Sequence, residues 1–235
     1  DEFRVNVKRT KPHVIAVSEV WMKEEFAIEG YHPAIRHDRE ESRKGGGVLI
    51  FVAESITVMD CPEMSEAPFE ESVWCTIKLG NSEQMILGLC YRTPSSSCDD
   101  NEKLLKTLRQ TELVHAQHLL VIGDFNYPEI DWDSGYVQGP EDSCAMKFYD
   151  TTQDLFWVQH TTCATRFRHG QSPSQLDLVF SKDEYAIDHV VASAPIGKSD
   201  HLVLTWDYQY QTGPARVAAQ DDPPRYNFKK GRYQD

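Results

Sequence analysis

Short apolar runs separated by polar turns are the main pattern of the chain, and their lengths are typical of buried β-strands. Gly80-Asn81-Ser82 separates two neighbouring runs and predicts a hairpin between them. The Gly45-Gly46-Gly47 turn leads directly into another run, as expected before a core strand. The pattern predicts strands at residues 13–17, 48–52, 72–79, 84–91, 119–122, 176–180, 189–192 and 201–206.

Helical periodicity occurs in fewer segments than the strand pattern does. Residues 1–10 have the spacing of an amphipathic helix, and further helices are expected at 101–115 and 144–155. Asp99 or Asp100 is the expected N-cap of the second helix. Because strands outnumber helices and do not alternate with them strictly, the order favours two packed, mainly antiparallel sheets flanked by helices. The predicted fold class is therefore a four-layer α/β sandwich.

The composition is that of one large globular domain rather than of two small ones. The chain has 235 residues, of which 40% are hydrophobic, and no apolar run reaches the roughly 20 residues that span a membrane. We therefore expect no membrane partner. Residues 1–208 are expected to form the domain, and residues 209–235, which are rich in Pro, Gly, Asp and Lys, to be a linker toward a missing downstream region.

The cysteines and the N-terminus bear on the cellular compartment. Six cysteines lie far apart without a C-x-x-C pair, which argues against a structural zinc site and against a disulfide framework. The sequence begins at Asp1 without a charged and then apolar leader, so we interpret it as a fragment that lacks a secretion signal. A reducing compartment, the nucleus or the cytoplasm, is the expected location.

Polar side chains recur where the predicted strands end. One carboxylate at a strand end is usually a turn or cap residue, so each position alone is weak evidence. Together they are stronger, because strands that pack against each other bring their ends to one rim, where clustered carboxylates need a cation. Oxygen ligands suit Mg²⁺, whereas zinc would want more His or Cys than are grouped here. The positions are Glu19, Tyr91, Asp124 with Asn126, Asp177, and Asp200 with His201.

The short sequence motifs around these positions resemble, in order, the motifs of the endonuclease/exonuclease/phosphatase superfamily, over about residues 13–208. In their individual residues, these motifs are similar to the apurinic-type endonuclease domain of CR1- or jockey-like non-LTR retrotransposons (LINEs). The resemblance implies a DNase I-like fold. The motifs are Ser18-Glu19-Val20-Trp21, Asp38-Arg39 with Gly45-Gly46-Gly47-Val48, Tyr91-Arg92-Thr93-Pro94, Gly123-Asp124-Phe125-Asn126, Gln175-Leu176-Asp177-Leu178-Val179-Phe180 and Gly197-Lys198-Ser199-Asp200-His201.

The same resemblance implies a metal site and a base. Glu19 matches the family's metal-ligand carboxylate, and Asp200 matches its second metal or water-positioning carboxylate. Asp124 matches the group that activates the attacking water. The implied cofactor is Mg²⁺, with Mn²⁺ as an alternative, and no small-molecule cofactor is expected.

The resemblance also implies groups that contact the phosphate. His201 matches the histidine at the scissile phosphate, and Asp177 matches the carboxylate that orients it. Asn126 matches a residue that binds a phosphate oxygen, and Tyr91 matches the active-site tyrosine. Such donors would stabilise the charge that develops in a phosphodiester transition state.

The implied function is a DNA endonuclease that nicks one strand and leaves a 3′-hydroxyl, from which reverse transcription is primed at the target. Its implied partners are double-stranded DNA and a reverse transcriptase downstream in the same polyprotein. Arg39 lies in a basic cluster with Arg36, Arg43 and Lys44 that is either a solvated loop or a contact to the phosphate backbone. Arg166 and Arg168 are further candidates for DNA contact, because their loop is basic in an acidic chain.

Two alternatives remain open at the level of sequence. The net charge of −13 opposes tight binding to DNA phosphates. It is compatible with a phosphoesterase of the same fold that acts on small, lipid or RNA phosphates. The other alternative is an inactive, domesticated binding module. It is motivated by the family's first strand and its metal-supporting Asn, which we expect to be absent from this sequence, since Asn6 lies in the helical pattern.

Overall fold

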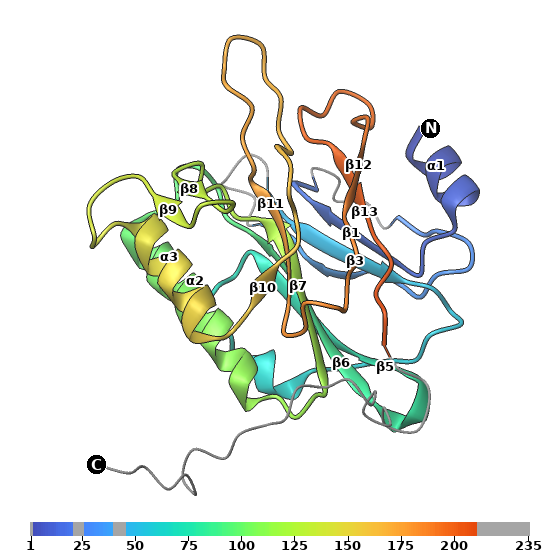
Figure 1. Ribbon diagram of the computed structural model, residues 1–235. Helices are drawn as coiled ribbons and strands as arrows, with labels where there is room; N and C mark the ends of the chain where they lie inside the picture. The colour runs from blue at the N-terminus through green and yellow to red at the C-terminus, as the bar shows by residue number, and fades with distance from the viewer. Residues whose placement is uncertain (1, 21–25, 40–45, 211–235) are drawn as a thin grey trace, which may run out of the picture.

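Two β-sheets pack face to face between layers of helices in the computed structural model, which describes residues 2–20, 26–39 and 46–210 (Figure 1). The larger sheet is made of β4 (Val58–Met59), β5 (Ser72–Lys78), β6 (Gln84–Tyr91), β7 (His118–Asp124), β10 (Val158–Gln159) and β11 (Asp177–Ser181). Its strand order is β10-β11-β7-β6-β5-β4. All neighbours are antiparallel except β6 and β7, which are parallel and are joined by a helical crossover.

The second layer of strands is made of smaller units. Its three-stranded sheet has the order β1-β3-β2, with β1 (Val14–Ser18), β2 (Ile35–His37) and β3 (Val48–Val52). A separate antiparallel pair is formed by β12 (Val191–Ser193) and β13 (Val203–Thr205). Another short pair, β8 (Ile130–Asp131) and β9 (Tyr136–Val137), lies beyond the end of β7.

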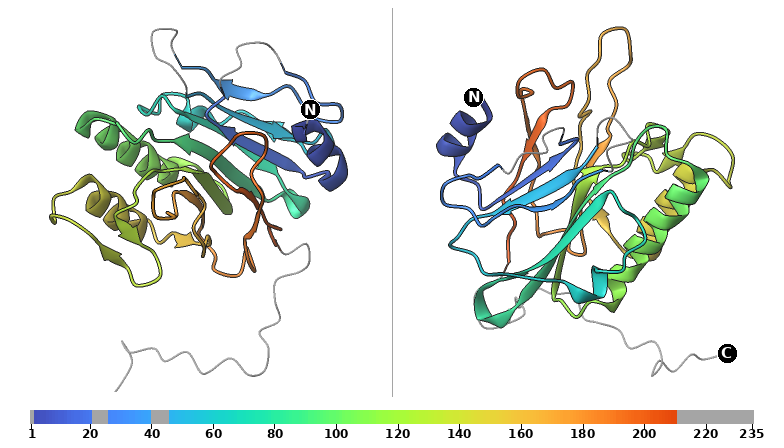
Figure 2. Two further views of the ribbon diagram at one scale, coloured as in Figure 1. Left: turned by 90° about the horizontal axis from the view of Figure 1, so that it is seen from above. Right: turned by 180° about the vertical axis from the view of Figure 1, so that it is seen from behind.

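Two helices pack against the outer face of the larger sheet, and a third lies next to the smaller sheet. The α-helices are α1 (Glu2–Thr10), α2 (Cys98–Gln110) and α3 (Cys144–Asp154), and short 3₁₀ helices occur at Pro62–Met64, Gly80–Ser82 and Thr111–Leu113. α2 and α3 lie side by side against the larger sheet, and α1 lies on the opposite side of the molecule (Figure 2). Phe3 of α1 contacts Phe26, which contacts Phe51 on the outer face of β3. These four layers confirm the predicted fold class.

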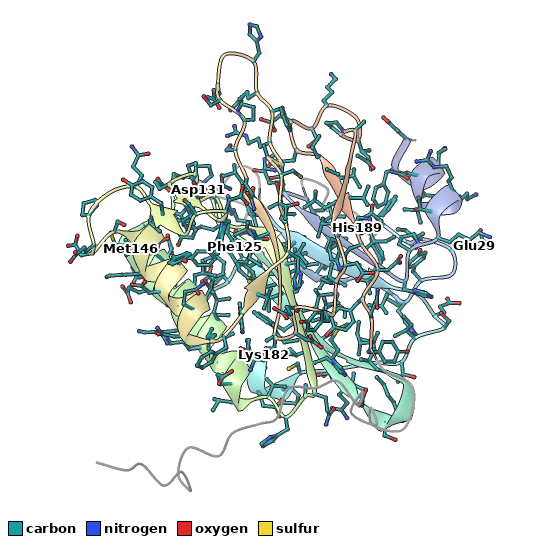
Figure 3. The ribbon with its side chains drawn as sticks, in the orientation of Figure 1. Glu29, Phe125, Asp131, Met146, Lys182 and His189 are labelled. Atoms are coloured by element: carbon teal, nitrogen blue, oxygen red, sulfur yellow. The ribbon has the colours of Figure 1, made fainter. Side chains whose placement is uncertain are left out.

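The alternation of side chains along the central strands divides the interior into two cores. In β6, Ile86 and Cys90 pack toward α2 and α3, whereas Leu87, Leu89 and Tyr91 pack toward the second sheet. This is the period of two that a strand buried on both faces must show. Phe125, which directly follows β7, lies on the helical side, where its ring centroid is 5.0 Å from that of Phe148 of α3 (Figure 3).

The structure differs from the sequence prediction mainly at the edges of elements. The expected cap of α2, Asp99 or Asp100, is wrong, because the helix begins earlier, at Cys98, and Ser97 is the N-cap. The Ser97 hydroxyl oxygen accepts the Asp100 N–H at 3.1 Å, while the Asp100 carboxylate accepts the Ser97 N–H, so Asp100 is the acidic member of a capping box. Short strands were not predicted either, namely β2, β4, β8, β9 and β10.

Some predictions fall on residues outside the described part of the chain. Trp21 of the first motif, Gly45 of the glycine turn, and Arg43 and Lys44 of the basic cluster are among these residues. Most of the predicted linker, residues 211–235, also lies outside. Among the helices that the structure describes, none has the length and apolar character needed to cross a membrane.

Candidate active site

Three of the predicted site residues form one row across the larger sheet. Tyr91 is the last residue of β6 and pairs with Asp124, the last residue of β7. Asp124 in turn pairs with Asp177, the first residue of β11. Because β6 and β7 are parallel and β11 is antiparallel to β7, these three positions lie at the same end of the sheet. The strand register alone therefore brings together residues that are far apart in the sequence.

The same register decides the direction of the three side chains. Directly paired residues point to the same face of a sheet, and residues two apart along a strand share that face. Leu89 precedes Tyr91 by two residues, Ile122 precedes Asp124 by two, and both belong to the core between the sheets. The row therefore faces the space between the two sheets, at the rim where the β1 strand also ends.

His201 completes the row from the segment before β13. Its Nδ1 is 2.8 Å from Oδ2 of Asp177, and its Nε2 is 4.0 Å from Oδ2 of Asp124. The backbone of His201 forms a β-bridge with Arg166, which fixes it beside the loop that precedes β11. Thr165 in that loop donates its hydroxyl to Oδ2 of Asp177 at 2.6 Å. The imidazole is thus held between two carboxylates, one of which is itself fixed by a buried threonine.

The charges of this group perturb the pKa values of its members. Burial opposes the charged form of His201, but the hydrogen bond to Asp177 and the charges of Asp177, Asp124 and Asp200 outweigh it, so that its pKa rises to about 9. The Asp124 side chain is 4% exposed. Burial raises its pKa well above the usual value, and the charge of Asp177 adds to this effect. At neutral pH the imidazole is therefore cationic, and Asp124 is an unusually basic carboxylate.

Glu19 reaches the site from the second sheet. It follows Ser18, the last residue of β1, and its backbone has a positive φ of 55°. The Tyr91 hydroxyl donates a hydrogen bond to Oε1 of Glu19. Burial and this bond to Glu19 raise the pKa of Tyr91, which keeps the phenol protonated. Tyr91 therefore joins the Glu19 carboxylate to the row on the larger sheet.

Asn126 sits at the same rim in a left-handed conformation, with φ of 50°. Its backbone N–H donates to Oδ1 of Asp124 at 3.2 Å, and its side-chain Nδ2 donates to the carbonyl of Arg92 at 2.8 Å. Arg92 is buried and returns a bond from Nη1 to the carbonyl of Asn126 at 2.7 Å. The reciprocal contacts fix the turn after β7, in which Asn adopts the αL geometry more readily than most residues other than Gly.

Asp200 and the arginines of the β10–β11 loop form a separate ion-pair group next to His201. Arg166 Nε donates to Oδ2 of Asp200 at 3.1 Å, and Arg168 Nε lies 3.8 Å from the same oxygen. The Asp200 side chain is 38% exposed. Burial opposes ionisation of Asp200, but the hydrogen bond and charge of Arg166 lower its pKa overall. Arg168 is 60% exposed, so it faces solvent in the loop that rises above the sheets in Figure 1.

The Arg39 side chain is mostly enclosed, with 14% of its surface exposed. It pairs with Glu71, whose Oε2 also accepts the N–H of Gly47 at 3.0 Å. Its guanidinium carbon lies 5.8 Å from the centroid of the Tyr91 ring. Arg39 and Tyr91 together line a cleft of about 180 Å³ with Thr93. The structure thus brings Arg39 next to the site, but with its charge paired with the partly buried carboxylate of Glu71.

One group among the described residues has the geometry to hold a metal ion. Ligand atoms of Asp124, Asp177 and His201 all lie within 4.8 Å of one another. The two residues predicted as ligands, Glu19 and Asp200, are not members of this group. Glu19 lies close enough to Asp124 for its charge to raise the Asp124 pKa. Carboxylates crowded at one rim offer the oxygen ligands that suit a divalent cation.

Comparison with known families agrees with this geometry. Residues 85–205, which include the row from Tyr91 to His201, match the family described as endonuclease-reverse transcriptase. The chain belongs to this family. It is therefore a member of the endonuclease/exonuclease/phosphatase superfamily of hydrolases, as the motifs predicted. A search of curated proteins found no match.

Solved structures with the same fold superpose on most of the chain of this endonuclease-reverse transcriptase family member. The endonuclease domain of TRAS1, a telomere-specific non-LTR retrotransposon, is 14% identical and superposes with a TM-score of 0.65, covering 89% of this chain and 92% of its own. The 3′ phosphatase NExo from Neisseria, bound to a product DNA hairpin, is 16% identical with a TM-score of 0.62, covering 88% and 93%. A mannosyl-6-phosphatase from Bacteroides thetaiotaomicron is 13% identical with a TM-score of 0.55, covering 88% and 89%. At these identities the likeness shows the fold.

Sequence reasoning missed three residues that support the site. Arg92 lies in a quoted motif, but nothing in its neighbourhood indicated that its charge would be buried among the carbonyls of Phe125 and Asn126. The side-chain hydroxyl of Thr165 also accepts the Asp177 N–H at 3.0 Å. In the sequence, only the neighbouring arginines of this loop suggested a function. Glu71 precedes β5 without any motif, and only the structure shows its contact with the glycine turn.

Proposed function

We propose that this family member is a divalent-metal-dependent DNA endonuclease that nicks one strand, leaves a 3′-hydroxyl and so primes reverse transcription of a non-LTR retrotransposon. Double-stranded DNA and a downstream reverse transcriptase are the proposed partners. The observation that carries the proposal is the row of Tyr91, Asp124 and Asp177 closed by His201, in a chain of the endonuclease-reverse transcriptase family. The fold of the TRAS1 endonuclease domain supports the same conclusion.

The phosphate is bound, in this proposal, by donors that the site already orients. With a pKa of about 9, His201 carries a proton on both nitrogens at neutral pH. Nδ1–H is taken by Asp177, which leaves Nε2–H to donate to a phosphate oxygen on the Asp124 side. The Asn126 amide has a second N–H besides the one bonded to Arg92, and it can serve the same phosphate. Both donors stabilise charge that grows in the transition state.

Asp124 is the proposed base that accepts the proton of the attacking water. Burial and its carboxylate neighbours raise its pKa, and a carboxylate with a raised pKa accepts a proton more readily than a solvated one. Its Oδ1 is fixed by the Asn126 N–H, so the orientation of the carboxylate is set before substrate arrives. Tyr91 has the proposed role of orienting Glu19 through its hydroxyl.

The site fits a divalent cation, and Mg²⁺ is the proposed one, with Mn²⁺ as the alternative. Glu19 would hold it, next to the carboxylates of Asp124 and Asp177, whose negative charge would favour a cation at this rim. A bound cation supplies Lewis-acid stabilisation of the phosphoryl oxygens. Asp200 remains a proposed ligand, although Arg166 already occupies its Oδ2. Arg39, Arg166 and Arg168 remain proposed DNA contacts.

Plasmid nicking tests the proposal. The protein with Mg²⁺ is expected to convert supercoiled plasmid to open circle, and EDTA should abolish the reaction. Asp124→Ala and His201→Ala are expected to lower the rate by about two to four orders of magnitude. His115→Ala, which removes an exposed histidine after α2, is the matched control and should keep full activity. A wild type that leaves the plasmid supercoiled with both Mg²⁺ and Mn²⁺ would refute the proposal.

DNA contact by the β10–β11 loop has its own test. The double variant Arg166→Ala, Arg168→Ala is expected to bind DNA more weakly, with a shallower dependence on salt, and to change the nick pattern. Because Arg166 also pairs with Asp200, Arg168→Ala alone separates DNA contact from support of Asp200. Unaltered affinity and nick pattern in both variants would exclude this role.

The alternative substrate class is a small, lipid or RNA phosphate. The net charge of −13 favours it, and relatives of the same fold include a 3′ phosphatase and a mannosyl-6-phosphatase. Phosphate release from such esters without plasmid relaxation would select this alternative. Binding of DNA without turnover of either substrate would select an inactive binding module.

A further inference from the structure

The two helices that cover the larger sheet begin with the same pair of residues. In α2, Ser97 is the N-cap and Cys98 is the first helical residue, and in α3, Ser143 is the N-cap and Cys144 is the first helical residue. Both serine hydroxyls accept a backbone N–H of their own helix, so both cysteines are fixed at the start of a regular first turn. Neither cysteine belongs to the site described above.

Side-chain contacts show that the two helices run parallel, with their first turns side by side. Lys147 Nζ donates to Oε1 of Glu102 at 2.9 Å, one turn into each helix. Arg109 Nη2 donates to Oδ2 of Asp154 at 3.0 Å, near the far end of both. Both contacts join residues 45 positions apart in the sequence, so the helices keep one register along their length. Continued back by one turn, this register places Cys98 beside the start of α3, where Cys144 lies.

The two thiols lie close enough for Cys98 to affect the pKa of Cys144, and they differ in exposure. All six cysteines of the chain are free, Cys98 is exposed, and Cys144 is only partly exposed. Burial raises the pKa of Cys144, and its hydrogen bond with Cys98 raises it further, while the charges of Arg92 and Lys147 lower it. Two free thiols at the starts of neighbouring parallel helices have the arrangement that an intramolecular disulfide needs, and the charges of Arg92 and Lys147 partly oppose the rise of the Cys144 pKa.

We propose that Cys98 and Cys144 are a redox modification site and form a reversible disulfide that joins α2 to α3. The proposal is independent of the nuclease function. The oxidant is a disulfide of the glutathione class. The Cys98 thiolate attacks it, a mixed disulfide forms, and one glutathione thiolate leaves. The Cys144 thiolate then attacks the Cys98 sulfur and expels the second glutathione thiolate, so that one disulfide is reduced while another forms.

The position of the bond links it to the support of the site. Cys98 lies one turn before Asn101, whose Oδ1 accepts Nε of Arg92 at 2.6 Å and the hydroxyl of Tyr127 at 2.7 Å. Arg92 in turn holds the carbonyl of Asn126. A bond between the two helix starts therefore restrains the turn that carries this network. Oxidation is expected to protect the first turns of α2 and α3 from local opening.

Peptide mapping after oxidation tests the proposal. The protein is incubated with oxidised glutathione, alkylated and digested with trypsin without reduction. Cleavage after lysine and arginine places Cys98 in peptide 93–103 and Cys144 in peptide 110–147, each of which holds a single cysteine. The expected product is the pair of peptides joined by a disulfide, with the loss of two hydrogen atoms, and a thiol reductant should release both.

Serine variants supply the controls. Cys144→Ser should stop the reaction at glutathione bound to Cys98, and Cys98→Ser should leave Cys144 mostly free. Cys163→Ser, which removes another partly exposed thiol outside the pair, should not change the yield of the joined peptides. Amide exchange in the first turns of α2 and α3 should slow on oxidation of the wild type and stay unchanged in Cys144→Ser. A wild type that accumulates only mixed glutathione disulfides overturns the proposal.

Discussion

Replacement of Asp177 by Asn tests the electrostatics of the site with little change of shape. The Asp177 Oδ2 atom accepts bonds from His201 Nδ1 at 2.8 Å and from the Thr165 hydroxyl at 2.6 Å. An amide oxygen can accept both bonds, so Asp177→Asn removes the negative charge and keeps the hydrogen-bond pattern. His201 then loses its main opposing charge, while the burial that lowers its pKa remains. We expect its pKa to fall from about 9 to about 7 or below.

The stability effect follows from the same pKa. A His201 pKa of about 9 in the folded protein, against 6.5 in the unfolded chain, corresponds to about 3 kcal/mol. Because the folded pKa is raised, this contribution is fully present below pH 6.5 and is lost as the pH rises through about 9. Asp177→Asn should therefore lower the free energy of unfolding by about 1 to 3 kcal/mol near pH 6, and by much less near pH 9.5.

Two measurements check this prediction in the presence of EDTA. Urea unfolding at both pH values gives the difference in stability, and an NMR titration of the His201 ring protons gives its pKa directly. Glu112→Gln is the control, because it removes a carboxylate that pairs with Lys182 outside the site and should leave the His201 titration unchanged. Equal destabilisation at both pH values, or an unshifted His201 titration, would show that Asp177 acts through shape rather than charge.

Three further predictions concern the support of the row. In Gly123→Ala the new Cβ would lie 1.9 Å from the Cys90 carbonyl oxygen, so the central strands must separate, and urea unfolding should show a loss of about 3 kcal/mol or more; a loss below about 1 kcal/mol would contradict the packing. Ser97→Ala should cost about 1 kcal/mol of stability through the lost cap of α2, whereas Ser95→Ala, in the preceding loop, should cost little. Tyr91→Phe should slow plasmid nicking by about tenfold or more while changing the melting temperature little, and wild-type kinetics would exclude its role.

The sequence predicted the parts of the fold whose signal is local and repeated. The apolar run 119–122 predicted the centre of β7. Because Tyr91 and Asp124 each follow such a run, the sequence also predicted that they lie at strand ends on one rim. Short strands such as β2 contain too few residues for a period of two to be visible. Pairings across the chain, such as Arg166 with Asp200, depend on the fold itself and leave no local pattern. The closeness of Tyr91, Asp124, Asp177 and His201 was therefore predictable, whereas their other partners were not.

The placement of Tyr91, Asp124 and Asp177 by ladder pairing also limits how such a chain can change length. Inserting or deleting one residue inside β7 would turn its following side chains to the opposite face, and Asp124 would then point at the helices instead of the space between the sheets. The loops beyond the rim have no such constraint. Length variation among relatives should therefore concentrate in segments such as 167–173, between the bridged residues Arg166 and Ser174, where a longer or shorter hairpin can change contacts with a substrate while the residues beneath it stay in place.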